Sequence, residues 1–309
     1  MNEETIAEIR TALFEGAAIP YLGPAVLALA GAGCALPAGH EALVAKLTVN
    51  SAVPFKLRKN LTGAAQFMEN FKHRKTVVAA MTAAFRPEMA PTALHRYLAA
   101  LPELRLLVHA WYDDLPQKAL AARRDWGMVQ GVSQAEHFGN WVHYFRADGT
   151  KTIPAADAIA DAPPEVNDWR PMLYQPLGSI SPAANYLVSD SDFVEVLTEI
   201  DIQTPIPKKV HELRTGRHFL FLGCRFNTQM ERMFARQIMK RSSRSHWAVL
   251  PDALTKNEAR FLVEQNIKRL DLPLAEFTSA LAGATGDAID GHHSPAGERA
   301  DAAASMVHA

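Results

Sequence analysis

Short apolar runs that alternate with amphipathic stretches are the feature that most constrains the fold of this 309-residue chain. An apolar run of about four to eight residues, bounded by turn residues, is typical of a strand that is buried on both faces. Such runs occur at 17–22, 104–110, 171–175, 218–222, 247–250 and 267–270. The sequence therefore predicts an α/β fold: a Rossmann-like, doubly wound parallel sheet with helical insertions.

Two long sections between the predicted strands indicate insertions into one domain that spans residues 1–283. Residues from about 40 to 100 have a mainly helical pattern and separate the first two strands. Residues from about 121 to 168 carry tryptophans and a Pro- and Asp-rich loop, and we expect a subdomain over the carboxyl edge of the sheet. The tail, 284–309, is rich in Ala, Gly, Asp and His without periodicity, so we expect it to be disordered.

Three helices have clear signals in the sequence. Residues 3–16 carry apolar side chains on one face, and a second helix is predicted after Ser189, with apolar residues at Phe193, Val196, Leu197 and Ile200. Thr228 and Glu231 form a Thr-x-x-Glu capping box directly after the strand at 218–222. The third helix should therefore begin at Thr228.

The charge balance argues against nucleic acid or a membrane surface as the partner. Lys and Arg number 32 and Asp and Glu number 33, so the formal net charge is −1 and no strong overall field attracts a polyanion. The longest apolar stretch, 17–38, is interrupted by glycines and prolines, which excludes it as a membrane helix. The partners that we expect are a nucleotide or another protein.

Cysteine usage and the first residues favour a cytoplasmic protein without a metal site. Cys34 and Cys224 are far apart and neither belongs to a C-x-x-C pair, so they cannot build a four-thiolate zinc site. We expect both to be reduced thiols. The chain begins with the acidic residues Glu3 and Glu4, where a secretory signal would be basic.

The turns that follow the predicted strands are where a ligand would bind, because ligands of open α/β sheets lie at the carboxyl ends of the strands. Glycine there lets a phosphate approach the backbone, and a following helix offers free N–H groups. The candidate ligand-binding residues are Gly23, Ala25, Trp111, Asp113, Leu177, Gly178, Gly223 and Asn227. The chain contains no G-x-x-x-x-G-K-[ST], H-E-x-x-H or G-x-S-x-G motif.

Taken in order, these turns resemble the sirtuin superfamily from about residue 10 to 250. Residues 19–25 look like the strand and Gly-Ala-Gly turn of that family, and 108–115 are similar to its Thr-Thr-Asn-Tyr-Asp-Asp-Leu segment. Residues 173–180 stand where it has Lys-Leu-His-Gly-Ser, and 219–232 resemble its late strand, turn and helix. The resemblance is to the bacterial branch without the zinc module.

The resemblance implies an NAD site, but two key residues are replaced. The family uses an Asn in the second motif and a His in the third on the nicotinamide ribose, and here these positions are Trp111 and Leu177. Neither side chain can take a proton, so deacylase and NAD-hydrolase activity by the family's route should be lost. Asp113, which the family uses to hold the carboxamide, is retained; a structural role in the turn is the other interpretation.

The glycine turn also departs from the family. Pro24 has no N–H to donate, and Ala25 adds a methyl group where close approach is needed. A second register places the turn at Gly31-Ala32-Gly33, followed by Gly39, and would make 25–30 the first strand. We favour Gly23, because residues 19–22 fit the strand that precedes the turn.

These observations lead to three functional hypotheses. The first is a catalytically impaired sirtuin-like protein that binds NAD, ADP-ribose or a related nucleotide, or a protein partner. The second is an NAD glycohydrolase or ADP-ribosyl-processing enzyme that uses other residues, namely Asp113, Asp114 or His109. The third is an interaction protein in which Trp111 plugs the pocket.

Overall fold

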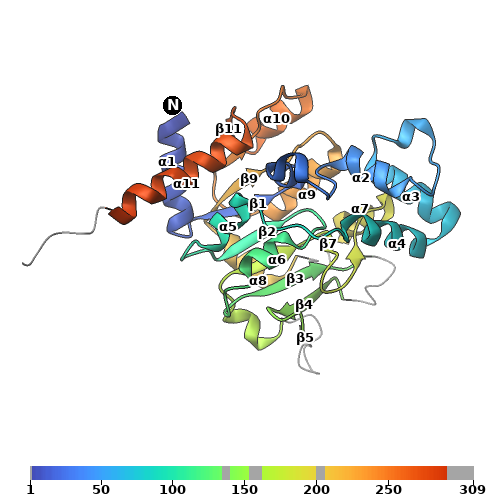
Figure 1. Cartoon of the computed structure of the whole chain (residues 1–309), viewed down its shortest axis with the longest axis horizontal. Helices are drawn as coiled ribbons and strands as arrows, with labels where there is room; N and C mark the ends of the chain where they lie inside the picture. The colour runs from blue at the N-terminus through green and yellow to red at the C-terminus, as the bar shows by residue number, and fades with distance from the viewer. Residues whose placement is uncertain (1, 134–139, 153–161, 200–205, 291–309) are drawn as a thin grey trace, which may run out of the picture.

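The computed structural model describes residues 2–133, 140–152, 162–199 and 206–290 (Figure 1). In these residues the main sheet has nine strands in the order β11-β10-β9-β1-β2-β6-β3-β4-β5. Neighbouring strands from β11 to β3 are parallel, and β4 and β5 are added antiparallel. The strands are β1 (Ala18–Leu22), β2 (Leu106–His109), β3 (Gly127–Gly131), β4 (Val142–Arg146), β5 (Lys151–Thr152), β6 (Met172–Gln175), β9 (His218–Leu222), β10 (His246–Val249) and β11 (Ile267–Leu270). The predicted α/β fold with a mostly parallel sheet is confirmed.

The order of the strands reverses at β1. From β1 the chain builds β2 and β6 on one side of it, and later places β9, β10 and β11 on the other side. Such a reversal leaves a crevice at the carboxyl ends of the central strands, which is where open α/β sheets bind ligands. The turns after β1, β2, β6 and β9 therefore meet at one edge.

The predicted apolar runs form strands because both faces of the sheet are covered. Side chains alternate along each strand: Ile19 and Tyr21 of β1 enter one core, and Ala18 and Leu22 enter the other. The same alternation separates Phe221 from its neighbours in β9. Strands with two buried faces need apolar residues throughout, as the sequence has.

Helices form a layer on each face of the sheet, as Figure 1 shows. One core includes residues of α1, α5 and α11, and the other includes residues of α2, α3, α4 and α7 to α10. The helices are α1 (Asn2–Phe14), α2 (His40–Leu47), α3 (Leu61–Lys72), α4 (Arg74–Phe85), α5 (Ala93–Ala99), α6 (Leu115–Leu120), α7 (Asp190–Glu199), α8 (Lys208–Arg214), α9 (Gln229–Met239), α10 (Lys256–Glu264) and α11 (Leu274–Asp290). Three 3₁₀ helices, η1 (Pro24–Gly33), η2 (Phe55–Leu57) and η3 (Pro164–Asn167), and a small hairpin, β7 (Gly178–Ser179) with β8 (Asn185–Tyr186), complete the described elements.

Residues 121–168 differ from the expected subdomain over the carboxyl edge. They contribute β3, β4 and β5 to the main sheet itself. The signal was hidden because β3 has a glycine at each end and a buried polar residue, Gln130, next to its last residue. Gln130 is tolerated there because its amide nitrogen donates to Gln175 Oε1 at 3.3 Å.

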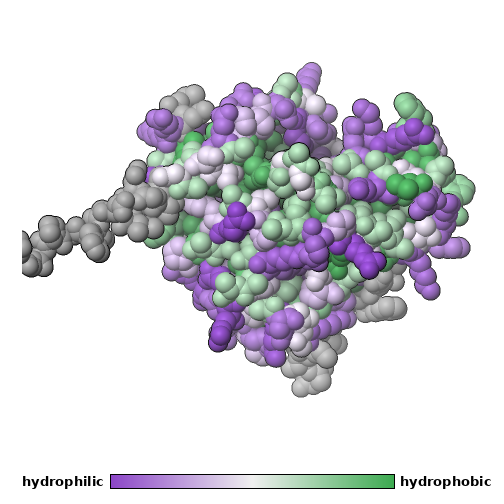
Figure 2. Space-filling view, in the orientation of Figure 1, coloured by the Kyte–Doolittle hydropathy of each residue, from purple (hydrophilic) through white to green (hydrophobic). Residues whose placement is uncertain are grey.

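The C-terminal region and the surface add two observations. Helix α11 continues to Asp290, past the expected start of the tail at 284, and the rest of the tail lies outside the described residues. Within the part of the chain that the structure describes, no helix combines the length and apolar character needed to cross a membrane. On the face in Figure 2, hydrophilic and hydrophobic side chains are interspersed.

Candidate functional site

A cavity of about 700 Å³ lies at the carboxyl ends of the central strands. Gly23 and Pro24 follow β1, Trp111 follows β2, Leu177 follows β6 and Cys224 follows β9, and all of them line the cavity. The volume is within the range of small-molecule sites, roughly 300–1,000 Å³. Three of the predicted ligand-binding residues, Gly23, Trp111 and Leu177, are therefore brought together.

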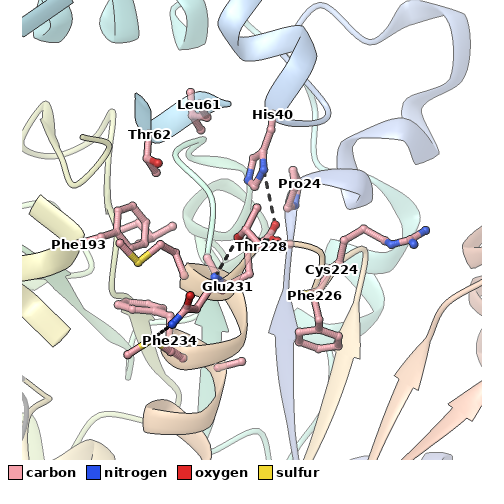
Figure 3. Close-up of a pocket in the computed structure, with 18 of the residues that line it drawn as sticks. Pro24, His40, Leu61, Thr62, Phe193, Cys224, Phe226, Thr228, Glu231 and Phe234 are labelled. Carbon is pink, nitrogen blue, oxygen red and sulfur yellow. Dashed lines mark hydrogen bonds and ion pairs between the residues drawn. The ribbon is translucent and has the colours of Figure 1, made fainter. Parts of the chain in front are cut away.

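The opposite side of the cavity is built from helix ends. His40 begins α2, Asn60 precedes α3, Asp190 begins α7 and Thr228 precedes α9, and each of them lines the cavity. Apolar side chains of α7 and α9, including Phe193 and Phe234, complete this side. Figure 3 shows the arrangement, with the polar groups of α2 and α9 facing each other.

Trp111 forms a wall of the cavity and does not fill it. Its side chain is buried, and the indole Nε1 donates to the carbonyl oxygen of Pro37 at 2.9 Å. The ring also packs on Tyr112 and Phe85, with centroids 5.0 and 6.0 Å away. The hypothesis of a Trp-plugged pocket is therefore not supported, since the cavity remains open beside the ring.

The strand-end groups of the cavity offer little acid–base chemistry. Leu177 and Trp111 have no titratable atom, as the sequence indicated. Burial raises the pKa of the Cys224 thiol, so this thiol stays protonated and is a poor nucleophile. Proton transfer by the route that the resemblance implies has no donor or acceptor at these positions.

The backbone amides of the glycine turn are already in use. Gly23 N–H donates to Leu222 O at 2.8 Å, and Ala25 N–H donates to Gly223 O at 3.0 Å. Val26 N–H donates to Gly23 O at 3.3 Å, and Pro24 has no N–H. A phosphate placed at this turn would therefore find no uncommitted amide among residues 23–26.

The structure decides between the two registers of the turn. Strand β1 ends at Leu22, and residues 24–33 form η1, so Gly23 is the strand-end glycine. Gly31 lies inside η1, with φ at 64°, and does not line the cavity. The register based on Gly31, with 25–30 as the strand, is wrong.

Glycine is required at the turns after β1 and β9 because the two turns touch. A Cβ at position 23 would lie 2.6 Å from Gly223 O and 2.8 Å from Cys224 Sγ. Gly223 has φ at +66°, and a Cβ there would lie 2.5 Å from Val26 N. These glycines therefore serve the contact between the turns, which is a packing role.

Asp113 and His109 are buried side by side, outside the cavity lining. His109 Nε2 lies 3.2 Å from Asp113 Oδ2, and Leu115 N–H donates to Asp113 Oδ1 at 3.1 Å. Burial acts to raise the pKa of Asp113, but the His109 ring and the Leu115 amide outweigh it and hold this pKa below its ordinary value. The geometry favours the structural interpretation of Asp113, at the start of α6.

The remaining predicted residues do not line the cavity. Ala25 is exposed, Gly178 and Gly223 are buried, and none of the three lines the cavity. A Cβ at Gly178 would lie 2.1 Å from Asn185 O of the small hairpin. Asn227 is exposed, and its amide nitrogen, oriented to donate, lies 2.7 Å from Glu258 Oε2.

Arg225 and Glu258 form an ion pair next to the cavity. Arg225 Nε and Nη2 each lie 2.8 Å from one oxygen of Glu258, and Nη1 lies 3.1 Å from Asp252 Oδ2. Burial acts to raise the pKa of Glu258, but Arg225 and the amides of Thr255 and Phe226 lower it to about 2. Arg225 lines the cavity, and its guanidinium is paired with the two carboxylates.

Sequence reasoning missed a histidine–carboxylate pair in the cavity. Glu231 Oε2 accepts from Thr228 N–H at 2.8 Å in the predicted capping box, which is confirmed. Its other oxygen, Oε1, lies 3.5 Å from His40 Nδ1 (Figure 3). The His40 ring in turn faces Trp111, with centroids 5.5 Å apart. No sequence signal links His40 to Glu231, because only the tertiary fold brings their helices together.

The resemblance implies NAD as the ligand, and the cavity fits the nucleoside part of NAD better than the diphosphate part. Its volume and its aromatic residues suit a nucleoside. The turn after β1 does not suit a diphosphate, because its amides are bonded within the protein. Within the described residues, no group of three or more His, Cys, Asp and Glu side chains is arranged to hold a metal ion.

Comparison with known proteins gives a family match and matches to solved structures. A family model described as a SIR2-like domain matches residues 105–270. A solved chain described as "Structural Basis for the Mechanism and Regulation of Sir2 Enzymes" aligns with 93% of this chain and 99% of its own length, at 10% identity and a TM-score of 0.39. No curated protein matches the chain. The family match begins at residue 105 and so does not include the turn at Gly23.

Proposed function

This chain belongs to the SIR2-like domain family, and from that premise we propose that it binds a nucleoside-containing ligand of the NAD or ADP-ribose type without the family's catalysis. The proposed site is the cavity at the carboxyl edge of the sheet. The family's deacylase reaction is lost in this proposal because the two proton-handling positions carry apolar side chains.

One observation carries the proposal. Gly23, Trp111 and Leu177 line one cavity, so the positions that the resemblance assigns to the nicotinamide ribose are both present and both apolar. A general base needs a titratable atom within hydrogen-bond reach of its proton, and neither side chain has one. The cavity can therefore hold a ligand, but the two positions supply no general base for the family's reaction.

The test separates binding from turnover. The full chain is titrated with NAD and with ADP-ribose by calorimetry, and incubated with NAD and an acetyl-lysine peptide while released nicotinamide is measured. We expect heat of binding and no deacylation. Sustained deacylation would contradict the loss of catalysis, and the absence of any binding heat would favour the protein-partner alternative.

A second candidate, hydrolytic turnover, is favoured by the pair of His40 and Glu231. An imidazole oriented by a carboxylate is the usual arrangement of a general base, and Glu231 Oε1 lies 3.5 Å from His40 Nδ1 in the cavity. The residues that the sequence suggested for this role, Asp113, Asp114 and His109, do not line the cavity. Nicotinamide release that is lost in His40→Gln and kept in His143→Gln would favour this candidate.

A further inference from the structure

We infer that the cavity selects a phosphate-free aromatic nucleoside, and a cationic one in preference to a neutral one, over the diphosphate of NAD or ADP-ribose. This inference rests on the proposed function, namely that the cavity binds a nucleoside-containing ligand. Four features of the lining support it: occupied backbone amides, paired cations, carboxylates at the cavity and aromatic walls.

The backbone offers a diphosphate few donors. The amides of Gly23, Ala25 and Val26 donate within the protein, and Pro24 has none. Two of the helices that begin at the cavity, α3 and α9, are capped by side chains: Asn60 Oδ1 accepts from Gly63 N–H at 3.0 Å, and Thr228 Oγ1 accepts from Glu231 N–H at 3.2 Å, whereas α2 has no side-chain cap. Anions bind at helix ends through such amides, so these bonds compete directly with a phosphate.

The permanent cations of the lining are engaged elsewhere. Arg225 donates two bonds to Glu258 and one to Asp252. Lys59 stands at the rim, with its side chain 80% exposed and its Nζ 3.5 Å from Glu41 Oε1. A phosphate would have to break the Arg225 pair or order an exposed lysine, and both changes oppose binding.

Carboxylates give the cavity a charge that repels phosphate. Glu231 and Asp190 line the cavity, and the Glu231 side chain is only 22% exposed. Repulsion between like charges grows as water is excluded, so a partly buried carboxylate disfavours a nearby phosphate more than a surface carboxylate would. The same charge attracts a cation.

Aromatic rings provide the binding surface for a base. The rings of Trp111 and His40, with centroids 5.5 Å apart, line the cavity, and Phe193, Phe226 and Phe234 line it as well. Aromatic faces favour planar rings and cations, because the face of the ring carries negative charge. A pyridinium nucleoside such as nicotinamide riboside combines both properties, and adenosine has only the first.

The experiment compares four probes on the full chain by calorimetry: nicotinamide riboside, adenosine, ADP-ribose and NAD. We expect nicotinamide riboside to bind about tenfold or more tighter than ADP-ribose, with adenosine between them. Tighter binding of ADP-ribose or NAD than of both nucleosides would overturn the inference and leave the proposed function intact. No binding of any probe would overturn the proposed function, and the inference with it.

A variant isolates the role of the carboxylate. Glu231→Gln removes the charge and keeps the capping box, in which Gln also serves at this position. We expect ADP-ribose to bind several-fold tighter and nicotinamide riboside to bind several-fold weaker than in the unchanged protein. The matched control is Glu88→Gln, since Glu88 is exposed, pairs with Lys118 and does not line the cavity. An unchanged ratio of the two affinities in Glu231→Gln would contradict the electrostatic selection.

Discussion

At the scale of single residues, the indole of Trp111 is fixed by its bond to Pro37 and by Tyr112 and Phe85, so it is part of the core as well as a wall of the site. Replacing it therefore changes stability and cavity shape together. Asp113, in contrast, is buried, does not line the cavity and is paired with His109. Its substitution should affect stability alone.

The first residue-scale prediction concerns a variant that carries the family's Asn and His at positions 111 and 177. Trp111→Asn combined with Leu177→His should not restore deacylation, because Ala25 N–H remains bonded to Gly223 O and Pro24 still lacks an N–H. The loss of the indole should lower the free energy of unfolding by about 2–4 kcal/mol. Product formation and urea unfolding measure the two effects. Robust deacylation by the double variant would show that the bonded amides of the turn after β1 do not prevent the reaction.

The second residue-scale prediction assigns Asp113 a structural role. Asp113→Ala should lower the free energy of unfolding by about 3 kcal/mol, since it leaves His109 and the start of α6 without their buried partner. Ligand affinity measured by calorimetry should stay the same. The control is Asp114→Ala, whose surface pair with Lys118 should be worth about 0.5 kcal/mol. A large loss of ligand affinity in Asp113→Ala, without such a loss in Asp114→Ala, would show that Asp113 takes part in ligand binding.

At the scale of elements, the strands β1 and β9 lie side by side and their following turns bond to each other. Sequence reasoning identified both strands because each is apolar and ends at a glycine. It did not identify β3, where Gln130 is buried through a bond to Gln175, a residue of another strand. It placed Trp111 and Leu177 at strand ends correctly, but the meeting of His40 with Glu231 depends on how α2 and α9 pack and leaves no local pattern.

The element-scale prediction tests the contact between the two turns. Gly223→Ala should lower the free energy of unfolding by more than about 2 kcal/mol, because it adds a Cβ 2.5 Å from Val26 N to an unfavourable φ of +66°. Gly216 is the matched control: its φ is +72°, and a Cβ added there would meet no atom within 4 Å. Gly216→Ala should cost only about 1 kcal/mol. Equal losses of unfolding free energy in the two variants would show that the turns after β1 and β9 move apart to accept the added Cβ.

At the scale of the whole molecule, the sheet is covered on both faces and several histidines are enclosed by that covering. Burial lowers the pKa of His95 to about 4, and it lowers the pKa of His246 to about 4 as well. Both residues are only 3% exposed. Protonation of these buried histidines should therefore destabilise the folded protein at low pH.

The whole-molecule prediction concerns stability at low pH. Both histidines are neutral in the folded protein down to about pH 4, whereas unfolded chains take up protons below about pH 6.5. The unfolded state then binds more protons, so stability should fall as the pH falls from 6.5 to 4, by up to about 3 kcal/mol per histidine. Urea unfolding across this range measures the slope. His95→Gln, which keeps the Thr92 capping box, should flatten it, and an unchanged slope would refute this origin.

The hydrogen bond from Ala25 N–H to Gly223 O limits which substitutions can be accepted at the turns after β1 and β9. An ancestor with a free amide at position 25 would have needed a different carbonyl orientation at position 223, because the two atoms now satisfy each other. Substitutions at the two strand ends should therefore be inherited together across related genomes. A relative with glycine in place of Pro24 is therefore expected to differ at position 223 or 224 as well.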